Sequence, residues 1–329
     1  MRTISALAAT AALAGLTLAP ALANDSTAEL GIGGLTLTRS ADVVMQSEDL
    51  FISESRVTVD YVFLNTSPAD VETVVAFPLP DVENGVEKPA YDFAGELDFR
   101  TTIDGRPAEL TLVYSAVLNG RDVTERLRAA KIPLMPSYEK FEAAVNALPP
   151  DARKALIAEG LIEEDGATPP GWTAHWTTKT AVTRTQVFPA GRPVKVSHSY
   201  KPFAGGSVGS ILKKDLRLSP DLKGEVAAHR AKFCIDDDFV KGFDASQGKD
   251  REAYRPDVWL SYVLTSGANW KGPIGDFRMV IDKGDPKNLV SFCGTGVRKI
   301  APTRFEVRYR DFVPRQDVNV LIVRPPTKY

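Results

Sequence analysis

The strongest constraint on the fold is an alternation of apolar and polar residues that recurs in short segments along the chain. In residues 56–65 the apolar side chains stand at every second position: Val57, Val59, Tyr61 and Phe63. A period of two places these side chains on one face of a β-strand, so the segment is expected to be a strand with one buried face. Three further segments before residue 120 have strand character: 71–79, 97–104 and 108–114.

A change of period predicts a helical insertion over residues 122–165. Asp122 and Glu125 have the spacing of a capping box, and Phe141 and Val145 recur at helical spacing before a Pro-Pro pair. Three short helices are expected, beginning near residues 123, 137 and 151.

Strand character returns at residues 179–188 and 194–200 and in five segments after residue 257, whereas residues 205–257 show no clear pattern. Short strands without regular alternation with helices favour sandwiches over a doubly wound sheet. We predict a mainly β protein with two antiparallel β-sandwich-like parts. Residues 24–204 would form an N-terminal domain that carries the insertion, and residues 205–329 a C-terminal β domain.

Residues 1–23 have the pattern of a signal peptide. Arg2 gives a positive start, residues 4–18 are largely apolar, and Ala21-Leu22-Ala23 is a small-x-small cleavage site before Asn24. No later segment approaches the roughly 18–20 consecutive apolar residues of a membrane-spanning helix. The mature chain is therefore expected to be periplasmic or extracellular and not transmembrane.

Cys234 and Cys293 are the only two cysteines. In an oxidising compartment such a pair is expected to form one disulfide. Their spacing matches neither a zinc site nor a Cys-x-x-Cys redox pair. Closure of a loop of about 60 residues would stabilise the fold by about 4 kcal/mol on the chain-entropy account.

Five segments together resemble an uncharacterised bacterial family, domain of unknown function 4424. They are Asn24–Ala28, Phe77–Pro80, Phe188–Ala190, His198–Tyr200 and Leu264–Ile274. The resemblance implies an exported protein with a β-rich fold, and it supplies no catalytic residues.

A second resemblance covers only residues 57–200. The order of Phe77–Pro80, Ile103–Arg106, Tyr138-Glu139 and Pro189–Gly191 is similar to that of vault protein inter-alpha-trypsin domains. Those domains are β-sandwich modules that mostly make interactions, which implies a binding role. Their usual companion, a von Willebrand type A domain, is not evident here.

The motifs give little support for catalysis. Gly205–Gly209 has the letters of a nucleophile elbow around Ser207, but no helix pattern follows, and only His229 lies downstream. Three scattered histidines do not suggest zinc, and we expect no metal or cofactor. His198 lies on the apolar side of its strand, which favours a hydrogen-bonding role in the core or across strands.

The charge balance excludes one class of partner. Without residues 1–23 the chain has 39 basic and 42 acidic residues, a net charge of −3. Nucleic-acid-binding domains usually have a basic excess, so no nucleic-acid partner is expected.

Tryptophans mark the candidate binding residues. Trp172, His175 and Trp176 cluster at the exit of the insertion, and Trp270 lies in a later loop. Such a cluster is either core or a binding surface; because tryptophan is enriched at interfaces, we expect at least one of the three tryptophans to be exposed.

The sequence favours a non-enzymatic exported module that binds an envelope protein or a glycan. The alternative is an envelope hydrolase whose site is assembled from distant acids. A shallow aromatic patch would favour binding, and a deep pocket with converging acids or histidines would favour the enzyme.

Cleavage of the leader is expected between Ala23 and Asn24, because small side chains precede that bond. N-terminal sequencing of the secreted protein should begin at Asn24. A start beyond about residue 27 would contradict this boundary.

Overall fold

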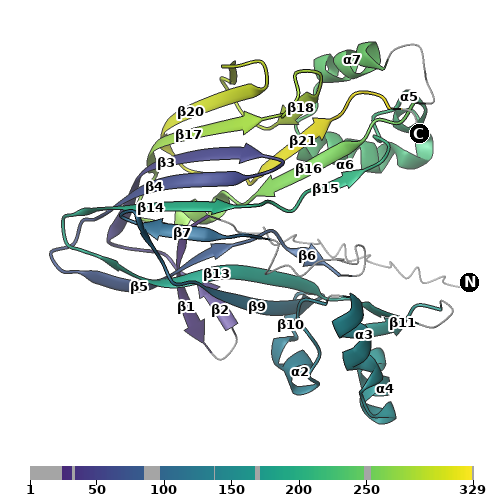
Figure 1. The fold of residues 1–329 in the computed structure, drawn as a ribbon, viewed down its shortest axis with the longest axis horizontal. Helices are drawn as coiled ribbons and strands as arrows, with labels where there is room; N and C mark the ends of the chain where they lie inside the picture. The colour runs from purple at the N-terminus through teal and green to yellow at the C-terminus, as the bar shows by residue number, and fades with distance from the viewer. Residues whose placement is uncertain are drawn as a thin grey trace, which may run out of the picture.

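The computed structural model describes residues 24–31, 34–84, 97–136, 138–166, 171–247 and 253–327. The predicted signal peptide lies outside these residues. Three large β-sheets dominate the fold, with a helical insertion at one end and a second helical group beside the last sheet (Figure 1). The predicted fold class, mainly β with sandwich-like parts and an inserted helical segment, is confirmed.

The central sheet has eight strands drawn from both halves of the chain. In order they are β19 (Arg298–Lys299), β20 (Arg304–Phe312), β17 (Ile274–Asp282), β3 (Val43–Ser53), β4 (Val57–Asn65), β14 (Pro193–Tyr200), β7 (Arg100–Ile103) and β8 (Arg106–Pro107). Strand β4 buries the predicted face, Val57, Val59, Tyr61 and Phe63.

Strands β3 and β17 pair in parallel, with Ser47 opposite Asp276 and Ser53 opposite Asp282. The strand ladders are otherwise antiparallel among the described residues, so this parallel pair is an exception within the predicted antiparallel architecture. Parallel neighbours need a long connection, and here more than 200 residues separate the two strands. Strands from both predicted domains thus share one sheet, and the division at residue 204 into folding units stays a prediction.

The N-terminal sheet has seven strands. In order they are β10 (Arg121–Asp122), β9 (Thr111–Leu118), β13 (Thr177–Phe188), β5 (Val71–Pro78), β1 (Ser26–Gly31) and β2 (Gly34–Leu37), and β6 (Val82–Glu83) also pairs with β13.

The insertion lies at the end of the N-terminal sheet near β9 and β10 (Figure 1). It contains α2 (Thr124–Ala129), α3 (Tyr138–Asn146), α4 (Pro150–Ala158) and the hairpin of β11 (Ile162–Glu164) and β12 (Trp172–Ala174). The three helices agree with the periodicity of the sequence. Their apolar faces form a core of their own around Leu127, Phe141, Val145 and Trp176.

The C-terminal sheet has four strands, β15 (Gly205–Ser207), β16 (Asp257–Tyr262), β21 (Val318–Val323) and β18 (Leu289–Phe292). Helical segments accompany it: α5 (Lys214–Arg217), η1 (Pro220–Leu222), α6 (Lys223–Lys232), α7 (Asp237–Ser246) and η2 (Thr265–Asn269). Phe233 and Phe243 from these helices pack with Leu321 and Val323, so one face of the sheet is covered by helices.

The N-terminal and C-terminal sheets contact the same face of the central sheet. The ring of Phe77, on β5, lies 5.1 Å from His198 on β14 and 6.1 Å from Tyr262 on β16, measured between centroids. The hydroxyl groups of Tyr262 and Tyr61, on β4, are 3.0 Å apart. We call the place where these four side chains meet the junction, because all three sheets contribute to it.

Cys234 and Cys293 form the predicted disulfide, with their Cα atoms 5.1 Å apart. The bond joins the chain just after α6 to the chain just after β18. Among the described residues, no helix has the length and apolar character needed to span a bilayer.

Replacement of both cysteines by serine is expected to lower the free energy of unfolding by about 4 kcal/mol. The bond closes a loop of 59 residues, and its loss restores conformational freedom to the unfolded chain. Urea unfolding of the double variant and of the oxidised wild type would measure the difference. A loss below about 1 kcal/mol would show that the chain-entropy account fails here.

Candidate functional site

The first described residues of the chain are buried in the junction. Asn24, Asp25 and Ser26 are all fully enclosed, although they begin the predicted mature chain. The loop after β16 holds them in place: the indole nitrogen of Trp270 donates to the backbone oxygen of Asp25 at 2.6 Å. A Cβ atom at Gly267 would be 2.6 Å from the side-chain nitrogen of Asn24, so any other residue there would displace the Asn24 side chain.

Asp25 forms a buried ion pair with Arg184 on β13. Both guanidinium NH groups donate to the carboxylate, at 3.2 and 2.7 Å. His198 Nε2 also lies 3.2 Å from Asp25 Oδ1, and Nδ1 of the same ring lies 2.7 Å from the hydroxyl of Thr101 on β7. The predicted hydrogen-bonding role of His198 within the core and across strands is confirmed.

Burial and the neighbouring charges shift the pKa values of Asp25 and His198 in opposite directions. Burial alone raises the pKa of Asp25, but the charges and hydrogen bonds of Arg184 and His198 outweigh it, and the pKa falls well below 3.8. Burial lowers the pKa of His198 below 6.5, against the attraction of Asp25. At neutral pH, Arg184 is therefore the main compensating charge for Asp25.

Glu48, on β3, is a second buried acid in the junction. Its carboxylate oxygens lie 2.9 Å from the Asn24 side-chain nitrogen and 3.2 Å from the Tyr262 hydroxyl. Burial raises its pKa to about 8, despite the hydrogen bonds from Asn24 and Tyr262. The Tyr61 hydroxyl donates to the Asn24 side-chain oxygen at 2.6 Å and completes the network.

The junction has the ionisable groups of a catalytic site without access for a substrate. Asp25, Glu48, Tyr61, Arg184, His198 and Tyr262 are each at most 5% exposed. The junction is therefore a structural network in this conformation.

An open groove lies between the central and C-terminal sheets, at their edges. It has a volume of about 950 Å³, and β17, β18 and β20 contribute to its walls. Phe277, Tyr309 and Phe312 form an aromatic cluster on one wall, with ring centroids 4.7 to 6.0 Å apart. The wall from the C-terminal sheet is provided by Val290 and Phe292.

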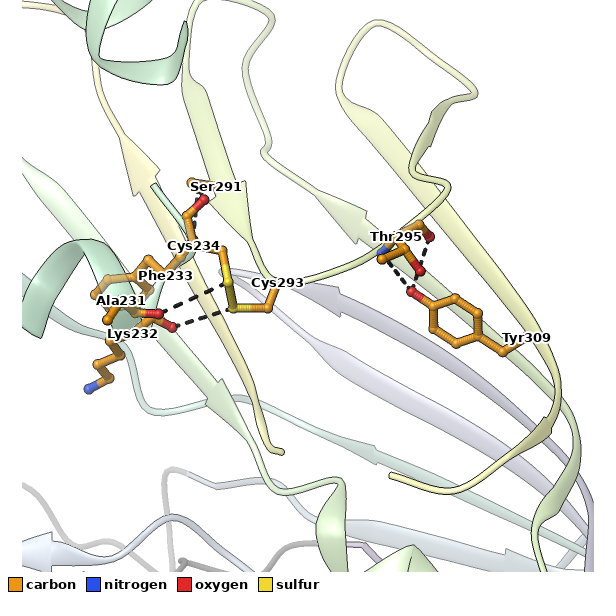
Figure 2. Close-up of a disulfide and its surroundings, with 8 residues drawn as sticks. All are labelled: Ala231, Lys232, Phe233, Cys234, Ser291, Cys293, Thr295 and Tyr309. Carbon is orange, nitrogen blue, oxygen red and sulfur yellow. Dashed lines mark hydrogen bonds between the residues drawn. A yellow bond between two sulfur atoms is a disulfide. The ribbon is translucent and has the colours of Figure 1, made fainter. Parts of the chain in front are cut away.

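The disulfide and a tyrosine fix the loop beside the groove (Figure 2). Cys293 begins this loop and is bonded to Cys234, and both cysteines line the groove. Across from them, the Tyr309 hydroxyl donates to the Thr295 backbone oxygen at 3.1 Å and accepts from its NH at 2.9 Å. The loop is thereby tied to the segment after α6 by the disulfide and to β20 of the central sheet by Tyr309.

Charged and polar residues at the end of β20 and just after it also line the groove. They are Arg310, Asp311, Arg315, Gln316 and Asp317. Asp317 accepts hydrogen bonds from the residues that begin η2, so its role there is structural. Arg310 contacts Asp276 at 3.4 Å. Among the described residues, Arg315 has no acidic side chain within 4 Å.

The prediction of an exposed tryptophan is wrong. Trp172, Trp176 and Trp270 are 7%, 0% and 3% exposed. Trp172 and Trp176 fill the core of the insertion, and Trp270 packs on Phe63 with centroids 4.5 Å apart. His175 is exposed and contacts Glu163 at 3.0 Å. Binding by these four residues stays a prediction, and none of them lines the groove.

The described residues contain no group of three or more His, Cys, Asp or Glu arranged for a metal ion. The Ser207 hydroxyl donates to the Gly209 backbone oxygen at 2.8 Å, within a turn after β15.

Most of these residues were not predicted from the sequence. Glu48, Leu50 and Ile52 occupy every second position of β3 and lie on its buried face. This alternation in the sequence was the one indication that an acid faces the core. No local signal connects Asp25 with Arg184, 159 positions later.

The comparisons with known proteins identify the family. A family model described as "Domain of unknown function (DUF4424)" matches residues 23–321. The chain belongs to this family. No curated protein matches significantly. A solved structure of a "putative nutrient binding protein" from Legionella pneumophila subsp. pneumophila str. Philadelphia 1 is similar at 13% identity and a TM-score of 0.43, covering 91% of this chain and 69% of that one.

Replacement of Arg184 by methionine is expected to lower the free energy of unfolding by about 3–5 kcal/mol, because it leaves Asp25 charged and buried without its main partner. Chemical denaturation at pH 7 would measure the loss. Arg126→Met is the matched control: its ion pair with Glu159 is exposed, so its loss should cost below about 1 kcal/mol. Equal losses for the two variants would contradict the role assigned to the buried pair.

Proposed function

We propose that the protein is a non-enzymatic binding module whose ligand occupies the groove between the central and C-terminal sheets. The observation that carries this proposal is an open cavity of about 950 Å³ with an aromatic wall. Small-molecule sites are typically concave, mainly apolar and roughly 300–1,000 Å³ in volume. The alternative of a hydrolase has less support, because the acids with strongly shifted pKa in the junction are enclosed.

The lining favours a small amphipathic acid as the ligand. The ring of Phe312 and the side chain of Val290 are partly exposed and offer apolar surface to an acyl or aryl group, and the buried ring of Phe277 packs behind Phe312. Arg315 lines the groove and is exposed, so its charge is available to a carboxylate. Of the partner classes expected from the sequence, a glycan is the alternative that the test below distinguishes, and an envelope protein stays a prediction.

We include export in the proposal. The Cys234–Cys293 disulfide is of a kind that persists in oxidising compartments, and residues 1–23 have the pattern of an export signal.

Dodecanoate is the probe for this proposal. Its binding is expected to raise the melting temperature and to displace the fluorescent dye 8-anilinonaphthalene-1-sulfonate from the groove. Phe312→Ala should weaken dodecanoate binding about tenfold, because it removes apolar contact area. Arg315→Glu should weaken dodecanoate binding and leave binding of dodecanol unchanged.

Arg106→Glu is the control for the charge reversal, because Arg106 is an exposed arginine on β8 and does not line the groove. It should leave dodecanoate binding unchanged. Absence of dodecanoate binding, or equal losses in Arg315→Glu and Arg106→Glu, would contradict the proposed ligand class. Binding of maltoheptaose without binding of dodecanoate would favour a glycan instead.

A further inference from the structure

The backbone nitrogen of Asn24 lies inside the junction, where every polar group of the residue has a partner. The nitrogen donates to the Ser266 hydroxyl at 2.5 Å, and that hydroxyl donates to the Asn24 backbone oxygen at 2.6 Å. The side-chain oxygen accepts from Tyr61, and the side-chain nitrogen donates to Glu48. The bond before this nitrogen is the predicted cleavage site, so cleavage there would release an amino group within the protein.

The hydrogen-bond contacts around Glu48 are all satisfied when its carboxyl group carries a proton while Asn24 is part of a peptide bond. Three oxygen–oxygen contacts run in series: Glu48 to Tyr262 at 3.2 Å, Tyr262 to Tyr61 at 3.0 Å, and Tyr61 to the Asn24 side chain at 2.6 Å. Each contact needs one hydrogen, and the two phenols supply only two. A protonated Glu48 carboxyl group supplies the third: Tyr262, which donates to the ionised carboxylate, then accepts from Glu48 and donates to Tyr61. The raised pKa of Glu48 agrees with this arrangement.

The charged groups around Glu48 supply no cation to it. Its acidic neighbour is Asp25, just before β1, which carries the same charge as the ionised form of Glu48. Arg184 on β13 and His198 on β14 are directed at Asp25, and the neighbours from β4 and β16 are the phenols Tyr61 and Tyr262. Among the described residues, no lysine or arginine forms an ion pair with Glu48.

We propose that Glu48 is the counter-ion for the α-ammonium group that cleavage before Asn24 releases. A leader-removing protease adds water across the Ala23–Asn24 bond, so that a carboxyl group forms on Ala23 and an amino group on Asn24. The amino group then takes the proton of Glu48. A neutral acid and a neutral amine become an ion pair, and the net charge of the junction does not change.

This proposal assigns a different role to Glu48 before and after cleavage. In the uncleaved chain Glu48 is a neutral hydrogen-bonding group, which glutamine can imitate. In the cleaved chain it is the anion that compensates a buried cation, and glutamine cannot replace that charge. The effect of Glu48→Gln on stability therefore depends on where the chain starts.

The test compares two chain starts, one at Asn24 and one that retains Leu22-Ala23, each made by removal of a cleavable fusion partner. Urea unfolding at pH 7 measures the effect of Glu48→Gln in both. The variant should raise the unfolding equilibrium constant about a hundredfold in the chain that starts at Asn24. In the extended chain it should not raise this constant, because glutamine needs no proton where Glu48 must take one up at pH 7. Glu72→Gln, an exposed change on β5, is the control and should act equally in both chains.

The pH dependence of stability gives a second readout. In the extended chain, the folded pKa of Glu48 is about 8 and its ordinary value is 4.5. The folded state therefore holds a proton that the unfolded state has lost, and stability falls as pH rises from about 4.5 to about 8. Glu48→Gln should remove this fall in the extended chain. In the chain that starts at Asn24, wild-type stability should not show this decrease with pH, because Glu48 is ionised in both the folded and the unfolded state.

The proposal is overturned if Glu48→Gln has the same effect in both chains. It is also overturned if the α-amino group of folded protein starting at Asn24 is acetylated at pH 7 as fast as that of an unfolded peptide. Protection of the amino group together with a start-dependent effect of Glu48→Gln supports it. Neither result depends on ligand binding in the groove.

Discussion

The ion pair between Asp25 and Arg184 is the interaction on which the arrangement of the sheets depends. It fixes the first described residues of the chain to β13, while His198 brings the central sheet to the same carboxylate. Trp270, from the loop after strand β16 of the C-terminal sheet, donates to the backbone of Asp25. Separation of the sheets would leave the buried charge of Asp25 without its partners, which costs free energy. These contacts therefore favour one relative position of the three sheets.

The two spaces between the sheets differ in what fills them. At the junction, the segment from Asn24 to Ser26 occupies the space. Its polar groups are satisfied by side chains from the N-terminal sheet, the central sheet and the loop after β16. Between β20 and β18 the described residues leave an open groove with aromatic walls. The same layered arrangement thus gives a closed polar centre and an accessible apolar surface.

The sequence predicted those parts of the fold that depend on local patterns. The strand at residues 57–63, the helices of the insertion and the Cys234–Cys293 bond each have a signal within one segment or one pair of residue types. The helices between residues 214 and 246 were missed because they are short and break the strand pattern without a long apolar period. The parallel pairing of β3 with β17 has no local signal, because register between distant strands depends on the complete sheet.

The candidate sites were harder to predict for the same reason. Tryptophan was expected at the surface because it is common at interfaces, yet Trp270 is needed inside to hold the chain start. The segments that carried the family resemblance, around Asn24, Phe77, Phe188, His198 and Trp270, are far apart in sequence and meet in or beside the junction. These motifs share one structural role, which is to build the junction, and this role is visible only when the sheets are assembled.

The parallel pairing of β3 with β17 also fixes the order in which the molecule can be completed. Contacts such as Asp49 with Arg278 span 229 positions, so the chain has a high contact order. A ribosome or a translocation channel delivers the N-terminal strands long before their partners from the other end. Until β17 emerges, one edge of β3 is unpaired and open to strands of other molecules. Such a chain is expected to depend on protection from aggregation until nearly its whole length is available.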